Sequence, residues 1–169
     1  MIADGYDLAI RASAHLEESS LICRKIYSSK AYTVASKEYI SRHGKPHHPR
    51  ELATHNGICY SNLKQPSRWD YIDTDGKPFF VDVRQKILCN NGHMQLAMVL
   101  AGHGIARLPS FYMEEALNDN RLEILFESCP NTEIDVYVVY PSRKHLSPKV
   151  RTFIDLAAER LGGKRSNVN

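Results

Sequence analysis

The chain lacks the features of membrane, fibrous and disordered proteins. In 169 residues there is no apolar run of the roughly 20 residues that a membrane-spanning helix needs. Nine Gly and eight Pro are too few for a collagen-like or disordered chain. The net charge is only +3, and the basic residues are scattered rather than aligned in a stripe, which disfavours direct nucleic-acid binding. What remains is a globular chain with the length of one domain or two small lobes.

Cysteine is also scarce, and its placement indicates a reducing compartment. Cys23, Cys59, Cys89 and Cys129 are widely separated, with no C-x-x-C pair, and no apolar signal segment follows Met1. Both observations predict a cytoplasmic protein. Three of the four cysteines lie inside strand-like runs, and we interpret the cysteines as small apolar side chains that fill the core. A redox sensor built on Cys59 or Cys89 is the alternative, in which a reactive thiolate would be modified ahead of buried thiols.

Short apolar runs and turn residues divide the chain into strands and helices. We expect strands at residues 6–11, 21–26, 31–35, 58–60, 69–83 (a hairpin around Asp75-Gly76), 81–89, 104–108, 122–126 and 134–140. We expect helices at residues 37–43, 49–53, 92–101, 111–117 and 148–161, which begin after Ser36, His48, Asn91, Ser110 and Ser147. The strand at 6–11 is predicted to be buried, with nothing before it to pair with. The alternation predicts an α/β fold with largely parallel strands.

Two of these helices have apolar residues at helical spacing, which predicts their buried faces. In the middle helix the spaced residues are Met94, Ala97, Met98 and Ala101. In the last helix they are Val150, Phe153, Ile154, Ala157 and Leu161.

No motif for catalysis or metal binding is complete. The sequence has no G-x-S-x-G elbow, no Walker A loop and no H-E-x-x-H pair. Gly102-His103-Gly104 follows a helix, whereas a dinucleotide-binding loop must follow a strand. His43, His47, His48 and His55 form a local group, but no carboxylate or cysteine stands at ligand spacing, so we expect exposed surface there. We therefore expect no enzymatic activity, no metal and no cofactor.

One segment favours ligand binding. Asn90-Asn91-Gly92-His93 opens a helix directly after a strand. The unpaired backbone N–H groups and the positive end of the helix dipole then face the same space, where small anions bind. A purely structural helix cap is the other interpretation, and the sequence leaves both open.

Four segments, in order along the chain, carry a family resemblance. They are Gly5-Tyr6-Asp7-Leu8-Ala9-Ile10-Arg11; Ala35-Ser36-x-x-Tyr39 with His43-Gly44-x-Pro46; Asn90-Asn91-Gly92 through Ala101-Gly102-x-Gly104-Ile105-Ala106-x-Leu108-Pro109; and Tyr140-Pro141-Ser142-Arg143-x-His145-Leu146-Ser147-Pro148-Lys149-Val150-Arg151-x-Phe153-Ile154-Asp155. Together they resemble the effector-binding domain of LysR-type transcriptional regulators.

The resemblance implies a type 2 periplasmic-binding-protein-like fold, in which two α/β lobes are joined by two crossover strands. Residues 1–31 and 132–161 would form a partial first lobe, residues 32–131 the second lobe, and residues 162–169 a disordered tail. Family members also carry a winged helix-turn-helix, a linker helix and the opening elements of the first lobe, and this sequence contains none of them. We therefore expect an N-terminally truncated domain whose first lobe is incomplete, with an unpaired sheet edge at residues 7–11.

The resemblance also implies a function. A small polar or anionic effector would bind between the lobes of a bacterial regulator, and DNA would be bound only by the absent winged helix-turn-helix. The full-length parent would be a homodimer or tetramer without a membrane partner. A solute-binding protein or a related two-lobed enzyme is an alternative. The residues that resemble effector-contacting positions are Ala12, Ser13, Tyr60, Asn91, Gly92, His93, Leu108, Pro109 and Ser110.

Overall fold

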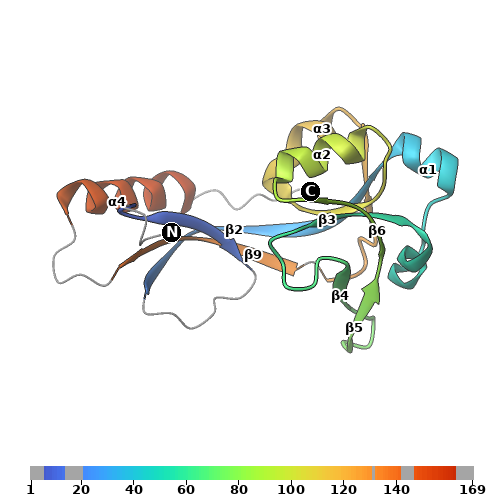
Figure 1. Cartoon of the computed structure of the whole chain (residues 1–169), viewed down its shortest axis with the longest axis horizontal. Coiled ribbons are helices and arrows are strands. Elements are labelled where there is room, and N and C mark those ends of the chain that lie inside the picture. The colour runs from blue at the N-terminus through green and yellow to red at the C-terminus, as the bar shows by residue number, and fades with distance from the viewer. Residues whose placement is uncertain (1–5, 14–20, 131, 142–146, 163–169) are drawn as a thin grey trace. The chain divides into compact units, whose positions relative to one another are not determined.

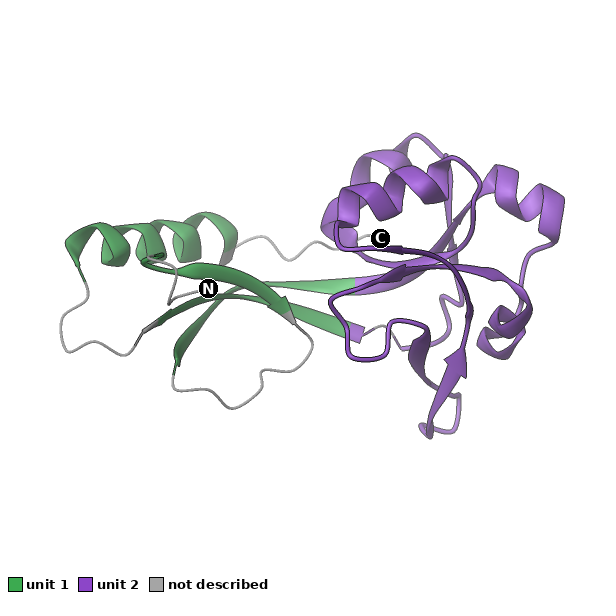
Figure 2. Cartoon of the chain, viewed as in Figure 1, with its two compact units in different colours: residues 1–30, 133–169 green, residues 31–132 purple. Residues whose placement is uncertain are grey.

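The chain forms two compact units. The computed structural model describes residues 6–13, 21–130, 132–141 and 147–162. Unit 1 comprises Met1–Lys30 and Glu133–Asn169, and unit 2 comprises Ala31–Thr132 (Figure 2). Two long strands, β2 (Leu21–Ser36) and β9 (Thr132–Pro141), contribute residues to both units. Apart from Gly162, the predicted disordered tail lies outside the described residues.

Unit 1 is a narrow sheet with one helix on it. β1 (Ala9–Ser13) pairs antiparallel with β9, which lies between β1 and β2 in the sheet. Helix α4 (Pro148–Gly162) lies along these strands (Figure 1). The core between helix and sheet contains Ile26, Val138, Val150, Ile154 and Ala157.

The N-terminal strand is not buried as predicted. It begins at Ala9, and the Ile10 side chain is 56% exposed. The reason is its place in the sheet: among the described residues β1 pairs with β9 alone, so one edge of β1 has no neighbouring strand. Val138, opposite Ile10 on β9, is fully buried because α4 covers it. The strand at the sheet edge therefore remains accessible.

Helix α4 buries a narrower face than its apolar spacing predicts. Phe153 is 41% and Leu161 is 40% exposed, whereas Val150, Ile154 and Ala157 are buried in the core with the sheet. Ser147 precedes the helix, and its carbonyl accepts the N–H of Val150 at 3.1 Å. Among the residues that the structure describes, its buried hydroxyl has no hydrogen-bond partner, and the predicted side-chain cap is not seen there.

Unit 2 is organised around the parallel pair β3 (Asn56–Tyr60) and β6 (Arg84–Cys89). A parallel bridge from Gly57 to Ile105 places the chain that enters β7 (Ala106–Pro109) beside β3. β7 and β8 (Leu122–Leu125) both run antiparallel to β2. The prediction of largely parallel strands is therefore wrong. Among the described pairings, only β3 has parallel neighbours: β6, and the chain that enters β7. The later strands β7 and β8 run back along β2 and are therefore antiparallel to it.

The local signals in unit 2 are mostly confirmed. Helix α1 (Lys37–His43) begins after Ser36, whose hydroxyl accepts the N–H of Tyr39. A short 3-10 helix, η2 (Pro49–Thr54), follows His48. β4 (Arg68–Ile72) and β5 (Pro78–Asp82) form the predicted hairpin, and Gly76 has the positive φ of 76° that its turn requires.

Three predicted elements have different bounds. Residues 21–26 and 31–35 belong to one strand, β2. The strand predicted at 81–89 breaks at Val83, because β5 pairs with β4 whereas β6 pairs with β3. The helix predicted after Ser110 is divided into η3 (Ser110–Tyr112) and α3 (Glu114–Asn118), with no side-chain cap bond at the start of either.

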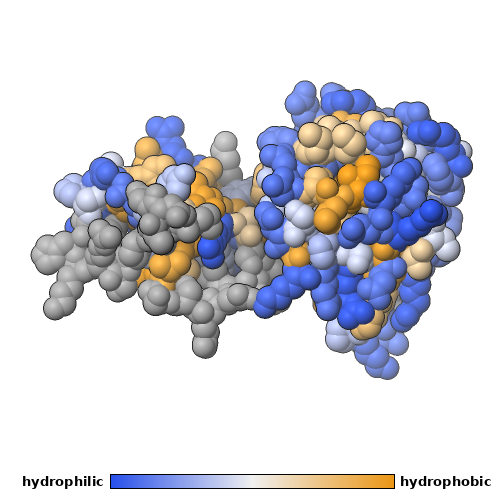
Figure 3. Space-filling model, viewed as in Figure 1, coloured by the Kyte–Doolittle hydropathy of each residue, from blue (hydrophilic) through white to orange (hydrophobic). Residues whose placement is uncertain are grey.

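Helix α2 (Gly92–Leu100) packs with a different face from the predicted one. Its buried residues are Gly92, Gln95 and Val99, whereas Met94 is 49% exposed. The Gln95 side chain donates a hydrogen bond to the Ile58 carbonyl of β3 at 3.0 Å, so a polar contact sets the orientation of the helix. Figure 3 shows apolar side chains gathered on the face of unit 2 that carries α2 and β6.

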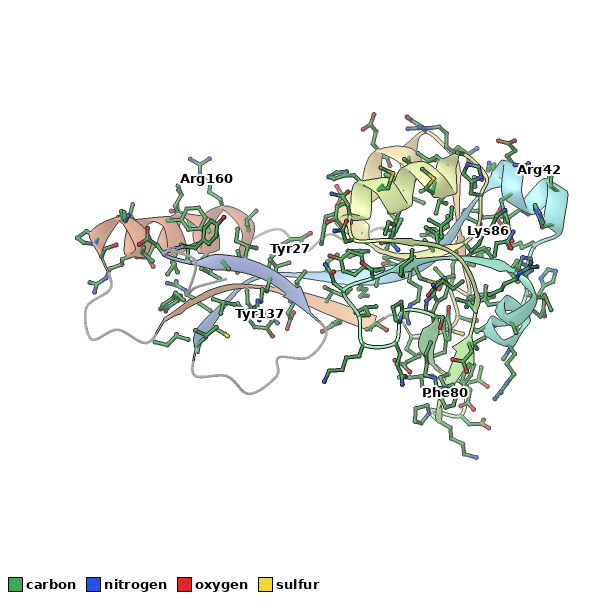
Figure 4. All side chains as sticks on the ribbon, viewed as in Figure 1. Tyr27, Arg42, Phe80, Lys86, Tyr137 and Arg160 are labelled. Carbon is green, nitrogen blue, oxygen red and sulfur yellow. The ribbon has the colours of Figure 1, made fainter. Side chains whose placement is uncertain are left out.

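The main core of unit 2 lies between the hairpin, η2 and the sheet. Its buried side chains are Ala35, Tyr39, Leu52, Cys59, Trp69, Tyr71, Val81, Val83, Ile105 and Leu125. The outer face of the hairpin is different: Phe80 is 53% exposed beneath the Arg68 guanidinium (Figure 4).

Candidate functional site

Three strand ends converge at one edge of unit 2. Tyr60 ends β3 and is the register partner of Cys89, which ends β6. The Ser61 N–H donates to the Cys89 carbonyl at 2.9 Å, which extends the pairing by one residue. β7 runs in the direction of β3 and ends at Pro109. In α/β sheets, ligands bind at the carboxyl ends of parallel strands. We call this region the carboxyl edge.

The start of α2 lies at the carboxyl edge and presents backbone donors. Asn91 caps the helix, since its side-chain oxygen accepts the Met94 N–H at 3.1 Å and its carbonyl accepts the Gln95 N–H at 3.0 Å. The N–H groups of Gly92 and His93 then have no acceptor within the helix. With the positive end of the helix dipole, they favour a negatively polarised ligand atom.

Tyr112 covers this helix start, and the sequence analysis did not identify it. A Cβ at Gly92 would clash with the Tyr112 ring, so only glycine allows this close packing. The His93 ring meets the Tyr112 ring edge-on, with 4.9 Å between centroids. Burial, with a smaller contribution from Tyr60, raises the pKa of Tyr112, so the phenol stays protonated at neutral pH. Its only sequence signal was the aromatic pair Phe111-Tyr112 directly after a strand end.

Tyr60 adds a second phenol to the carboxyl edge. The side-chain amide of Asn62 donates to the Tyr60 hydroxyl at 3.2 Å, which orients it. The side chains of Tyr60, Asn91, His93 and Tyr112 offer hydroxyls, an amide, an imidazole and ring faces. That set can hold a polar ligand by hydrogen bonds and stacking.

The remaining candidate residues have other environments. Leu108 and Ser110 are completely buried, whereas Pro109 is partly exposed. Ala12 and Ser13 lie on β1 in unit 1, opposite Val136 and Asp135 of β9. The carboxyl edge of unit 2 thus comprises Tyr60, Asn91, Gly92, His93 and Pro109 among the predicted residues, with Tyr112 added.

The histidine group is engaged in structural contacts. The Nδ1 atoms of His43, His48 and His55 lie at 3.1 Å from the Tyr39 carbonyl, the Arg50 N–H and the Tyr39 hydroxyl, respectively. Within the part of the chain that the structure describes, no three His, Cys, Asp or Glu side chains are grouped so that they could hold a metal ion.

The cysteine environments disfavour the redox alternative. All four cysteines are free thiols. Burial raises the pKa of the Cys59 thiol to about 11 and also raises the pKa of Cys89. Cys59 is paired with Leu88, and Cys89 with Tyr60, so the two cysteines point to opposite faces of the sheet. A disulfide between them would require these strands to rearrange.

Comparison with known proteins defines the class. A family model described as the LysR substrate binding domain matches residues 1–162. An uncharacterised HTH-type transcriptional regulator of Haemophilus influenzae is 34% identical over 150 residues, which cover 89% of this chain and 51% of that protein. The regulatory domain of CrgA, a LysR-type transcriptional regulator from Neisseria meningitidis, superposes with a TM-score of 0.81 at 28% identity, covering 95% of this chain and 78% of that one.

A full-length structure is also similar. AphB, a virulence activator from Vibrio cholerae and a member of the LTTR protein family, superposes with a TM-score of 0.77 at 27% identity, covering 93% of this chain and 52% of that chain. The chain spans about half the length of the curated relatives it matches.

The chain therefore belongs to the LysR substrate-binding-domain family, the ligand-responsive regulatory domain of LysR-type transcriptional regulators. Its fold is the type 2 periplasmic-binding-protein-like fold of those domains, which confirms the resemblance and the predicted class. The matched relatives are transcriptional regulators rather than enzymes. Among the described helices, none combines the length and apolar character needed to cross a membrane.

Proposed function

We propose that this chain senses a small polar or anionic effector for a bacterial LysR-type regulator, and that the carboxyl edge of unit 2 supplies one wall of the effector site. The observation that carries the proposal is the convergence of three strand ends with the start of α2, where Asn91 caps the helix, Tyr112 packs against Gly92, and Tyr60 ends the neighbouring strand. Backbone donors and neutral hydroxyls bind carboxylates and polar metabolites without buried ion pairs.

The proposal extends to the whole regulator. Residues 1–31 with 132–161, and residues 32–131, are taken as the two lobes, and Ala12 and Ser13 contribute contacts from the first lobe. Effector binding favours one arrangement of the lobes, provided that it binds that arrangement more tightly than the alternatives. The parent binds DNA through its own winged helix-turn-helix, as a homodimer or tetramer in the cytoplasm.

A ligand screen with a matched pair of variants tests the site. Small carboxylates and their neutral amide analogues are titrated while backbone amide signals are followed by NMR. We expect a carboxylate to shift the Gly92 and His93 amides, and Asn91→Ala to weaken its binding because the helix start loses its cap. Asn90→Ala removes an exposed neighbouring amide and should leave the affinity unchanged. Equal loss in both variants, or shifts confined to other parts of unit 2, would contradict the proposal.

A further inference from the structure

A buried tyrosine links α1 to the beginning of β3, at the opposite end of that strand from the carboxyl edge. Tyr39 is 1% exposed. Its phenol oxygen accepts the Asn56 N–H at 3.1 Å, and the same oxygen lies 3.1 Å from Nδ1 of His55. Because the Asn56 amide can only donate, the hydroxyl proton of Tyr39 is free to be donated to His55.

When the Tyr39 hydroxyl donates to His55, the Nδ1 atom of the imidazole must be unprotonated. Nδ1 accepts the phenol proton only if it carries no proton itself. If His55 is protonated, Nδ1–H points at the phenol oxygen, and the Tyr39 hydroxyl proton must find another acceptor in a partly buried site. A hydroxyl proton that is shielded from water and has no acceptor is unfavourable, so protonation of His55 works against the native contact.

Taken together, the surroundings of His55 favour its neutral form. His43, on α1, stacks on the Tyr39 ring at 4.3 Å and donates from Nδ1 to the Tyr39 carbonyl. Burial and the neighbouring His43 lower the pKa of His55 below its ordinary value of 6.5, while Glu51 on η2 acts against them with a smaller effect.

The contact can affect the sheet because Asn56 bonds both to Tyr39 of α1 and to the chain that enters β7. The Asn56 carbonyl accepts the Ile105 N–H at 2.9 Å, which joins β3 to the chain entering β7. Gly104 packs so closely on the Asn56 carbonyl that a Cβ there would clash. Because one phenol oxygen makes both contacts, a Tyr39 side chain that turns away from His55 also leaves the Asn56 N–H, at the point where two strands of the sheet meet. α1 carries Arg42, which is labelled in Figure 4.

We propose that Tyr39, His55 and Asn56 form a proton-sensitive clamp, closed when the His55 imidazole is neutral and opened when it takes up a proton. At pH values between the lowered folded pKa and the unfolded value near 6.5, the unfolded chain binds more protons than the folded one. Stability is therefore lost as the pH falls below about 6.5 and is fully present above it. This makes unit 2 a domain whose α1–β3 junction responds to mild acid, independently of any effector.

The experiment combines NMR titration with amide exchange on the intact chain. We expect His55 to titrate below 6.5 in the unaltered protein. The Asn56 amide, corrected for the intrinsic rate at each pH, should lose protection on acidification from pH 7.5 to 5.5. Tyr39→Phe removes the proton donor to Nδ1, so the His55 titration should move toward 6.5.

His55→Asn supplies the control for stability. Asparagine places an amide oxygen near the position of Nδ1 and does not titrate in this range, so the variant should lose less melting temperature than the unaltered protein on acidification. His47→Asn, at an exposed neighbouring histidine, should behave as the unaltered protein does. A His55 pKa at or above 6.5, or an Asn56 amide equally protected at both pH values, would overturn the clamp. An equal loss of melting temperature in His55→Asn would do the same.

Discussion

The two units of this chain differ in how completely their strands are covered. Unit 2 buries aromatic and aliphatic side chains from the hairpin, the short helices and the sheet in one cluster. In the described part of unit 1, the buried cluster is smaller: Ile26 and Val138 of the sheet pack against Val150, Ile154 and Ala157 of α4. The same fold family can thus place a well-packed core and a thin one within one chain. We expect most of the free energy of unfolding to come from unit 2, because buried apolar area is the dominant stabilising contribution.

The largest expected effect comes from truncating a buried side chain in the core of unit 2. Leu52 on η2 is 1% exposed, so Leu52→Ala should destabilise the protein by roughly 2–5 kcal/mol through lost burial and a residual cavity. Urea denaturation followed by far-UV circular dichroism measures the change. Leu63→Ala, at a side chain that is 55% exposed, is the control and should stay within about 0.5 kcal/mol. Similar losses in the two variants would show that this core is not where the stability resides.

The second prediction concerns the buried polar contact of α2. Gln95→Ala leaves the Ile58 carbonyl without its donor in a buried site, which should cost roughly 1–3 kcal/mol. Thermal unfolding monitored by Trp69 fluorescence provides the measurement. Gln85→Ala, at an exposed glutamine of β6, should be nearly neutral. A neutral result for Gln95 would mean that apolar packing alone orients the helix.

Native-state hydrogen exchange compares the units directly. Amides of β1 and the unit 1 part of β2 should exchange at least about tenfold faster than those of β3 and β7, because thin cores open locally at lower free energy. The rates are measured by NMR or mass spectrometry at one pH. Uniform protection across both units would show that the two cores open at similar free energies, contrary to this expectation.

Two serines that precede helices, one in each unit, allow the contribution of a single hydroxyl group to stability to be compared. Ser36 caps α1, so Ser36→Ala should cost about 1 kcal/mol. Ser147 precedes α4, but its buried hydroxyl has no partner in the described part of the chain, so Ser147→Ala should be neutral or slightly stabilising. Chemical denaturation of the two variants measures the change in the free energy of unfolding for each. A clear loss from Ser147→Ala would show that its hydroxyl is hydrogen-bonded in solution.

The smallest expected effect is on thiol modification. Because burial raises the pKa of Cys59 to about 11, roughly one thiol in ten thousand is ionised at pH 7. Iodoacetamide labelling followed by mass spectrometry should modify the less buried Cys23 of unit 1 ahead of Cys59. Preferential labelling of Cys59 or Cys89 would restore the redox alternative.

Local signals were the most predictable part of the fold. Ser36, Asn91 and Gly76 act within a few residues of their own positions, and the structure confirms the helix starts and the hairpin turn that they predict. The candidate site was predictable to the same extent. Asn91 and Gly92 were identified because a helix start is visible in the sequence, whereas Tyr112 was missed because its contact depends on how η3 packs across α2.

Pairing and packing were not predictable in this way. The direction of β7 and β8 against β2 depends on contacts between residues more than 70 positions apart, which no local pattern encodes. The buried face of α2 was predicted from Met94 and Met98, yet Gln95 occupies it, because one buried carbonyl on β3 needs a donor there.

By itself the sequence determined the helix caps at Ser36, His48 and Asn91, the hairpin turn, the alternation of strands and helices and, through four short motifs, the family. These depend on backbone conformations and hydrogen bonds between near neighbours, which the residue types fix directly. Only the tertiary structure decided which strands pair, which helix face is buried, and that Tyr39 links His55 to Asn56. Those features come from side chains meeting across the fold, where burial and partner geometry outweigh local preference.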